Sequence, residues 1–306
     1  MSQDSLPKQV KIVEVGPRDG LQNEKNFVAN EIKIELINRL TTAGFANIEA
    51  AAFVSPKWVP QMAGSHEVMA GIDRRPGTIY SVLVPNMQGY DRAREAGVDE
   101  VVVFSAASEA FAQKNINCSI DESIARFEPI AKAAKADGIR LRGSISCALG
   151  CPYQGEVTPA EVVSVAQKMR DLGCDEIDIA DTIGVATPGR VKAVFEALQV
   201  VLPVERFAGH FHDTYGQSLA NIYAALQMGV SIFHSSIAGL GGCPYAKGAT
   251  GNVATEDVIY LLRGLGIETG VNFEEVARIG AFMTHAIDRP NHSRAGKAFM
   301  ASQGKA

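Results

Sequence analysis

The strongest constraint on the fold is a regular alternation of two kinds of segment. Short apolar runs rich in β-branched residues are separated by longer segments with helix-type spacing of Ile, Leu, Val and Ala, at intervals of roughly 30 residues. Such alternation is typical of β-α units, in which helices connect parallel strands. The predicted strands are residues 10–15, 46–52, 78–84, 100–105, 139–146, 176–180, 206–212 and 231–237.

The strand count favours an α/β fold of one type, the (β/α)8 TIM barrel. Segments with helical spacing, such as 31–42 and 159–172, lie between the strands, and several end at a glycine, as helix C-caps do. The alternative is a doubly wound open sheet, which usually has roughly five or six strands and a glycine-rich first turn. Here the first turn reads Gly-Pro-Arg-Asp-Gly at 16–20 and is not a G-x-G-x-x-G loop. We therefore expect a closed barrel.

The chain has 306 residues, a length that two average domains could share but that α/β barrels commonly use as one unit. No linker or low-complexity tract divides it. A further apolar segment at 273–287 follows the last predicted strand. We predict a single catalytic barrel domain over residues 1–306, with residues from about 270 onward forming a C-terminal helical extension.

The composition is that of an ordinary globular protein, with 46% hydrophobic residues, 21% charged residues and a net charge of −5. Lys and Arg are not clustered, which argues against a nucleic-acid surface. No apolar stretch of about 18 residues is present, so we expect no membrane span. Five scattered cysteines fit a reducing compartment, and residues 1–10 lack the apolar core of a signal peptide. A cytoplasmic location is expected.

Polar residues gather where the predicted strands end, which is the face of a barrel that carries its chemistry. They come from five different strands or the loops that follow them: Glu14 with Arg18 and Asp19, then Glu49, then Asp178 and Asp181, then His210 and His212, and finally Cys243 and Asn252. This convergence predicts an active site at the carboxyl ends of the strands.

Each of these residues also has a purely structural interpretation. Arg18-Asp19 lies between glycines and could form a solvated turn, and Asp181 could cap the segment after it. Glu14 and Glu49 lie in apolar strands, where buried carboxylates are rare unless they are paired. A structural salt bridge from either glutamate to Arg18 is the expected pairing.

The His-x-His sequence at 210–212 ends an apolar run and predicts a cation site. Because side chains alternate along a strand, both imidazoles lie on one face, where neutral imidazoles can bind a divalent cation. The alternative is two histidines that hydrogen-bond each other and solvent. With Asp19 and Asn252 as further donors, the ligand set contains nitrogen and oxygen without thiolate, which favours Mg²⁺ or Mn²⁺ over zinc, the second choice.

The segment 238–252 is a long loop in which five residues are glycine. Loops with glycine hinges over an active face are commonly lids. Cys243 in this loop is either inert or a reactive thiol, since a nearby cation or arginine can lower the pKa of a cysteine. The other cysteines, such as Cys174, are interpreted as structural.

Taken together, these motifs resemble the 3-hydroxy-3-methylglutaryl-CoA lyase family over residues 10 to about 273. The Gly-Gly-Cys-Pro-Tyr-Ala sequence in the loop is the most specific of them, and isopropylmalate and homocitrate synthases share the Arg-Asp and His-x-His elements but have a different loop. The motifs that carry the resemblance are VGPRDGLQNE at 15–24, NINCS at 115–119, SCALGCPY at 146–153, DTIG at 181–184, HDTYGQ at 212–217, the loop 239–252 and ATED at 254–257.

The resemblance implies cleavage of an acyl-CoA substrate, 3-hydroxy-3-methylglutaryl-CoA, to acetyl-CoA and acetoacetate by a homodimer, with roles in leucine catabolism and ketone-body formation. At His234, on the eighth predicted strand, the family tends to have an acidic residue, which bears on substrate preference and on the metal environment. The implied roles are metal ligation by Asp19, His210, His212 and Asn252, contact with the thioester carbonyl by Arg18, acid/base chemistry by Cys243 and a supporting role for Glu14, Glu49 and Asp181.

The implied reaction is a retro-Claisen cleavage, in which the C3 hydroxyl loses its proton and the departing carbon becomes an enolate. Arg18 supplies a fixed positive charge where the thioester oxygen becomes anionic. Cys243 is the candidate donor of a proton to the enolate, and Asp19 and His210 are candidates for removing the hydroxyl proton. Lys25, Lys114 and Lys247 are candidate contacts for the CoA phosphates.

Three alternatives remain at this point. The first is a lyase for a longer 3-substituted 3-hydroxyglutaryl-CoA, with the same chemistry and a different pocket. The second is a Claisen-type synthase that condenses acetyl-CoA with a 2-oxo acid. The third is a non-catalytic metal-binding or scaffold barrel, which would leave buried Glu14, buried Glu49 and a reactive thiol without a purpose.

Overall fold

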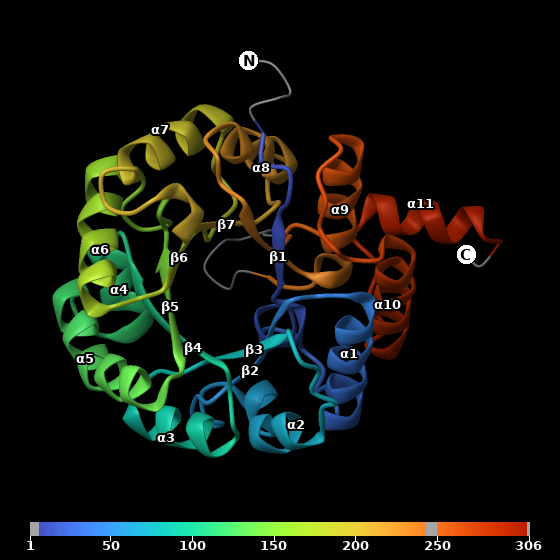
Figure 1. Ribbon diagram of the computed structural model, residues 1–306, viewed down its shortest axis with the longest axis horizontal. Helices are drawn as coiled ribbons and strands as arrows, with labels where there is room; N and C mark the ends of the chain where they lie inside the picture. The colour runs from blue at the N-terminus through green and yellow to red at the C-terminus, as the bar shows by residue number, and fades with distance from the viewer. Residues whose placement is uncertain (1–5, 243–249, 305–306) are drawn as a thin grey trace.

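The structure, a computed structural model, describes residues 6–242 and 250–304. Eight parallel strands close into a barrel in chain order, and β1 pairs with both β2 and β8 (Figure 1). The predicted (β/α)8 barrel is confirmed, with each predicted strand present. The strands are β1 Lys11–Glu14, β2 Asn47–Ala52, β3 Ile79–Leu83, β4 Glu100–Ala106, β5 Arg140–Ser146, β6 Glu176–Asp181, β7 Phe207–Phe211 and β8 Ile232–Ser235.

Helices form a ring around the strands (Figure 1). Two of them begin at capping boxes, in which Ser119 pairs with Glu122 and Thr158 pairs with Glu161, so the local sequence itself fixes where these helices start. The ring helices are α1 Asn30–Ala43, α2 Ser65–Gly71, α3 Met87–Glu95, α4 Glu109–Ile116, α5 Ile120–Asp137, α6 Pro159–Leu172, α7 Pro188–Leu198 and α8 Ser218–Gln227.

The predicted C-terminal helical extension is also confirmed. It comprises α10 Phe273–Ala286 and α11 Arg294–Ser302, and it follows α9 Thr255–Gly264, the helix that comes after β8. The helix α10 packs against α1, and α11 packs against α9 and α10 on the outer side of the ring (Figure 1). Single helical turns occur at η2 Gly16–Gly20, η3 Pro60–Met62, η4 Val204–Arg206 and η5 Ile237–Gly239.

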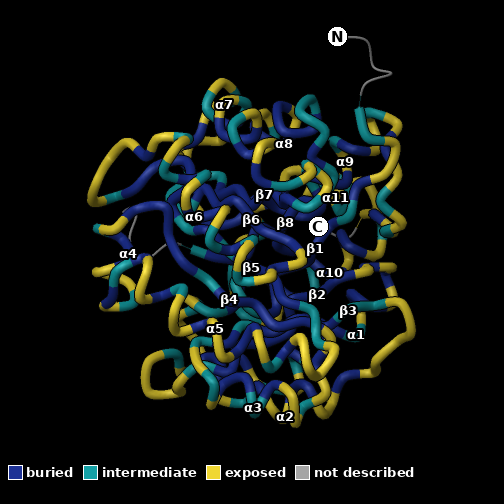
Figure 2. Tube along the Cα trace, turned by 60° about the vertical axis from the view of Figure 1, so that its left-hand side comes forward, coloured by how far each residue is buried: buried dark blue, intermediate teal, exposed yellow. Residues whose placement is uncertain are grey.

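The apolar core lies between the strands and the inward faces of the helices, and the exposed residues lie on the outer loops and helix faces (Figure 2). Within the described ranges, the helices are all too short or too polar to span a bilayer. The predicted eighth strand runs to residue 237, but β8 ends at Ser235. The difference arises because the backbone turns into η5, where Ile237 donates its N–H to Glu14.

Candidate active site

The turn η2 holds Arg18 and Asp19 at the carboxyl end of β1. Its two terminal glycines are required by close packing: a Cβ at Gly16 would lie 2.6 Å from Oε1 of Glu14, and one at Gly20 would lie 2.6 Å from Oγ of Ser236. The turn therefore packs closely against Glu14 at the end of β1 and against Ser236, the residue after β8, and a side chain at either glycine would require these groups to move.

The guanidinium of Arg18 is held by two carboxylates. Its Nε donates to Oε1 of Glu49 on β2, and its Nη1 donates to Oδ1 of Asp19 at 2.9 Å. Burial opposes the charged form of Glu49, but Arg18 and Arg142 outweigh it and lower the Glu49 pKa to about 2. The predicted salt bridge from Glu49 to Arg18 is present, and it fixes the direction of the arginine.

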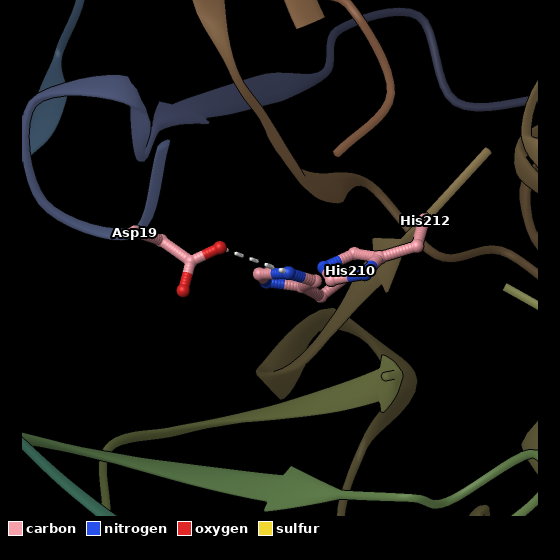
Figure 3. Close-up of side chains that lie close together, drawn as sticks. All are labelled: Asp19, His210 and His212. Carbon is pink, nitrogen blue, oxygen red and sulfur yellow. Dashed lines mark ion pairs between the residues drawn. The ribbon is translucent and has the colours of Figure 1, made fainter. Parts of the chain in front are cut away.

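Asp19, His210 and His212 converge on one point at this mouth of the barrel. Each offers a ligand atom, and these atoms all lie within 4.8 Å of one another. Figure 3 shows the Asp19 carboxylate facing the His210 ring, 3.9 Å from Oδ2 to Nε2, with the His212 ring beside it. Asn252 joins them by donating from Nδ2 to Oδ2 of Asp19 at 2.7 Å. The structure therefore brings together the four predicted cation ligands.

The protonation states of these groups suit a cation. Burial lowers the pKa of His210 to about 3 and also lowers that of His212, so both imidazoles are neutral near pH 7. Burial opposes the Asp19 carboxylate, but Arg18 and the two histidines outweigh it and lower its pKa, so Asp19 is charged. Two neutral imidazoles and one carboxylate are ligands that divalent cations accept.

Two buried atoms beside this cluster lack hydrogen-bond partners among the described residues. They are Nδ1 of His212 and Oδ1 of Asn252. A buried polar atom without a partner is costly, and an amide oxygen such as Oδ1 of Asn252 is a type of ligand that Mg²⁺ accepts. The donor set therefore fits the divalent cation that the sequence predicts. Among the described residues, neither of the two candidate metal-binding clusters contains a cysteine, and the Asp19, His210 and His212 cluster fits Mg²⁺ or Mn²⁺ as well as the His/His/Asp zinc site that was the second choice.

Glu14 does not pair with Arg18, so the predicted salt bridge to Arg18 is wrong for Glu14 and holds only for Glu49. Its carboxylate accepts hydrogen bonds from the backbone N–H groups of Gly16 and Ile237 and from Oγ1 of Thr255 at 2.6 Å. Glu14 therefore connects the turn that carries Arg18 to the residues that flank the 238–252 loop, Ile237 on one side and Thr255 on the other. Burial raises the Glu14 pKa to about 7, against the lowering effect of these three hydrogen bonds.

The two aspartates of β6 lie in different places. Asp181 accepts hydrogen bonds from the N–H groups of Val185 and Ala186, both at 3.0 Å, which is the capping role given above as its structural interpretation. Asp178 does not lie at the strand end: it is inside the barrel, where Oγ of Ser144 donates to it at 2.8 Å. Neither residue is part of the Asp19 cluster.

Cys243 and Lys247 lie outside the described residues. The described start of their loop is fixed, because Asn23 donates to the carbonyl of Gly242 and Arg289 donates to that of Gly241, each at 3.1 Å. Of the other cysteines, Cys174 is buried, and burial raises its pKa to about 12, as expected for a structural thiol.

A group of buried charges inside the barrel was not predicted from the sequence. Arg142 of β5 is fully buried and donates from Nη2 to Oε2 of Glu49 at 2.5 Å, while its Nε lies 3.2 Å from Oε1 of Glu100. Glu49 is therefore shared between two arginines. The signal was the alternation in Arg140-Leu-Arg-Gly-Ser144, which places Arg142 and Ser144 on the inward face of the strand.

The fold and the site together define a (β/α)8-barrel enzyme with a candidate divalent-cation site at the carboxyl ends of its strands. The chain belongs to the HMGL-like family, whose model matches residues 9–283. The resemblance found in the sequence is thereby confirmed.

Relatives of known name support this assignment. The 3-hydroxy-3-isohexenylglutaryl-CoA/hydroxymethylglutaryl-CoA lyase of Pseudomonas aeruginosa is 57% identical over 97% of this chain and 99% of its own length. The crystal structure of hydroxymethylglutaryl-CoA lyase from the same species superimposes with a TM-score of 0.96 and 56% identity, covering 97% of this chain and 99% of that one. An Acinetobacter baumannii HMG-CoA lyase in complex with coenzyme A and 3-methylmalate gives a TM-score of 0.92 at 35% identity, covering 97% of both chains.

Proposed function

We propose that this protein is a divalent-cation-dependent carbon–carbon lyase that cleaves 3-hydroxy-3-methylglutaryl-CoA to acetyl-CoA and acetoacetate. The observation that carries the proposal is the position of Arg18, whose Nη1 is bonded to Asp19 while Asp19 faces His210. A fixed positive charge thus lies beside the candidate cation ligands. Cleavage of the C2–C3 bond needs these two features together, because charge develops on the thioester oxygen as the C3 hydroxyl loses its proton.

The residues that would hold Mg²⁺ or Mn²⁺ are Asp19, His210, His212 and Asn252. When bound, the cation supplies Lewis acidity that makes the C3 hydroxyl easier to deprotonate. The C3 hydroxyl proton passes to a base, for which Asp19 and His210 are the candidates, and the O–H electron pair forms the ketone of acetoacetate. The electrons of the breaking C2–C3 bond pass to the thioester carbonyl, and the guanidinium of Arg18 stabilises the resulting enolate oxygen. Because Glu49 and Asp19 already orient Arg18, this stabilisation needs no rearrangement during the reaction.

The enolate carbon must then gain a proton to give acetyl-CoA, and we assign this step to the thiol of Cys243. That residue lies outside the described residues. Support comes from its neighbours: Gly242 is tethered by Asn23, and Asn252, at the other end of the loop, is bonded to Asp19. A loop with both ends beside the site suits a residue that closes over bound substrate.

The experiment that tests the proposal is product analysis on a panel of 3-hydroxyglutaryl thioesters, with Mg²⁺ or Mn²⁺ added and then removed by a chelator. We expect acetyl-CoA and acetoacetate from the 3-methyl substrate, and loss of turnover on chelation that the cation reverses. Absence of cleavage for every thioester would remove the proposed function. Incubation with acetyl-CoA and 2-oxo acids tests the synthase alternative, for which we expect no product.

A second candidate substrate is favoured by one relative. The Pseudomonas aeruginosa protein is named as a lyase for both 3-hydroxy-3-isohexenylglutaryl-CoA and the 3-methyl compound. The same panel should therefore include a thioester with a long 3-substituent. Equal kcat/KM for the two substrates would indicate the broader specificity, and a preference for the 3-methyl substrate would indicate the narrower one.

The homodimeric state and the cytoplasmic location stay predictions. Light scattering on the purified chain would test the first, and imaging of the tagged protein in the cell would test the second. The assignment of residues 1–306 to one catalytic domain is likewise a proposal, which a single cooperative unfolding transition would support.

A further inference from the structure

A third histidine, His234, lies against the proposed cation ligand His210. The two residues are register partners on the adjacent strands β7 and β8, and His234 is 1% exposed. Nδ1 of His234 is 3.3 Å from Nδ1 of His210, with the rings edge to face at 70°. Because both rings present the same kind of nitrogen, this contact is a hydrogen bond only if one of the two nitrogens carries a proton and the other does not.

The environment of His210 decides which nitrogen donates. Its other nitrogen, Nε2, points toward Asp19 and the cation cluster. A neutral imidazole whose Nε2 offers a lone pair must carry its proton on Nδ1. The Nδ1–H of His210 is then the donor, and Nδ1 of His234 is the acceptor.

The ring proton of His234 must then be on its other nitrogen, Nε2, which lies 3.8 Å from Oε1 of Glu176. That oxygen is buried and has no other hydrogen-bond partner among the described residues. Nη1 of Arg142 lies 3.0 Å from Nε2 and 3.4 Å from Nδ1, so it contacts both nitrogens of the His234 ring, and its shorter contact would favour the opposite placement of the proton. However, Arg142 already pairs with two carboxylates, Glu49 and Glu100. Leaving Oε1 of the buried, charged Glu176 without a hydrogen-bond donor would cost more than leaving Arg142 without this additional acceptor.

Glu176 is itself held in place from the far mouth of the barrel. Its Oε2 accepts from Nζ of Lys11 at 2.5 Å, and the Lys11 side chain is 29% exposed at the start of β1. Burial opposes the charged form of Glu176, but His234, Lys11 and Arg142 outweigh it and lower its pKa to about 2. A continuous line of contacts therefore runs from His210 through His234 and Glu176 to Lys11.

We propose that His234 is a positioning residue that accepts the Nδ1 proton of His210 and so holds Nε2 of His210 free for the divalent cation. Groups that orient a metal-bound histidine in this way typically contribute about 10–100-fold to metal affinity. The inference rests on the cation site of the proposed function but not on its substrate. It can therefore be tested by metal binding alone.

A pair of substitutions separates the hydrogen bond from the space that the ring fills. In His234→Asn, the side-chain oxygen can take the place of Nδ1 as acceptor, whereas His234→Leu has a similar size and no acceptor. Mn²⁺ is titrated into each full-length, chelator-treated protein by calorimetry, without substrate. We expect affinity within about threefold of wild type for His234→Asn and a loss of about 10–100-fold for His234→Leu. Equal affinities for the two variants would overturn the proposal, and His285→Leu, on the exposed face of α10, is the control.

A second measurement uses the unsubstituted protein and does not depend on how a variant folds. With ¹⁵N-labelled histidine and Mg²⁺ bound, we expect Nδ1 of His210 to be protonated and to show a scalar coupling to Nδ1 of His234 across the hydrogen bond. An unprotonated Nδ1 on His210 would contradict the proposal.

A different role for His234 is also distinguishable. Asp178, His210 and His234 offer ligand atoms within 4.8 Å of one another, so they could themselves hold a cation. We expect one Mn²⁺ per chain. Two Mn²⁺ per chain, falling to one in His234→Leu, would make His234 a ligand and overturn the positioning role. If Mn²⁺ binds as expected but no thioester is cleaved, the proposed function fails and this inference stands.

Discussion

Arg18 donates from Nε to Oε1 of Glu49, and the same carboxylate accepts from Arg142 through its other oxygen. One glutamate therefore orients the arginine at the mouth of the barrel and neutralises part of the charge inside it. The catalytic charge and the buried charge network are joined at this residue.

The first prediction concerns the positive charge of Arg18. We expect Arg18→Gln to lower kcat by roughly 10²–10³, the typical cost of losing a group that stabilises a developing oxyanion. Mn²⁺ affinity should be retained, because the four proposed ligands remain. Steady-state kinetics and Mn²⁺ titration check this, with Arg39→Gln, an exposed arginine paired with Glu35 on α1, as the control. Near-normal turnover in Arg18→Gln would remove its proposed role.

The second prediction concerns the stability that Glu49 provides. Replacing it by Gln removes one of the carboxylates paired with Arg18 and one of those paired with Arg142, while Asp19 and Glu100 remain as their partners. Breaking a buried ion pair costs up to about 3–5 kcal/mol, and we expect a loss toward the lower end of that range. The matched control is Glu35→Gln, whose pair with Arg39 is exposed and is expected to contribute about 0.3–0.5 kcal/mol. Urea unfolding measures both free energies. Similar values for the two variants would show that the buried network does not stabilise the barrel.

The third prediction concerns the cation and His212. A cation that binds only the folded chain stabilises it, by about 2.7 kcal/mol at a concentration 100 times its Kd. We expect Mn²⁺ to raise the melting temperature of the wild type and of His285→Ala, and to have little effect on His212→Ala at the same concentration. The measurement is thermal unfolding with and without Mn²⁺. An equal rise in all three proteins would place the cation elsewhere.

The fourth prediction is a dependence of stability on pH that arises from Glu256. Burial raises its pKa from 4.5 to about 8, so between these values the folded chain holds a proton that the unfolded chain has lost. Its contribution to stability therefore falls as pH rises through this window, by at most about 1.4 kcal/mol per pH unit.

The substitution Glu256→Gln removes this titration but keeps an oxygen that can accept from the N–H of Ala238. Relative to wild type, we expect the variant to gain stability steadily from pH 5 to pH 8. Glu14, with a pKa raised to about 7, contributes in the same direction in both proteins, and its charge also raises the pKa of Glu256, so part of the difference reports the repulsion between these two carboxyl groups. Urea unfolding at several pH values gives the comparison, and parallel curves for the two proteins would contradict the assignment.

The fifth prediction concerns Cys243. We expect Cys243→Ser to fold with wild-type stability and to lose activity by about 10²-fold or more, as when a general acid is removed. Cys174→Ser is the control, because Cys174 is buried near the start of β6 and has no part in the proposed reaction. Comparable losses of activity in the two variants would argue against Cys243 as the proton donor.

The sequence was sufficient to predict the barrel and the convergence of the candidate cation ligands at its mouth, because both depend on local periodicity. Alternation along a strand places His210 and His212 on one side, and the closure of eight strands brings Asp19 beside them. The same rule could have shown that Glu14 points away from Arg18. Val13 belongs to the apolar cluster inside the barrel, so its neighbour Glu14 faces the outer layer.

The buried network was harder to foresee. A charged residue in a strand predicts a partner but does not identify it, since the partners of Arg142 come from β2 and β4, far away in sequence. Asp181 differs, because its capping interpretation followed from the sequence and only the particular N–H groups, those of Val185 and Ala186, needed the structure. Which contacts form in the buried network depends on the three-dimensional closure of the barrel.

The pairing of β1 with β8 also has a consequence for how the protein is made. Asp19 and Asn252, whose side chains are hydrogen-bonded, are separated by 233 positions in the chain. During translation, the first of these residues leaves the ribosome long before the second. A nascent chain that has not yet exposed Asn252 therefore lacks part of the proposed ligand set, and the complete set can form only when the last strand has joined the first.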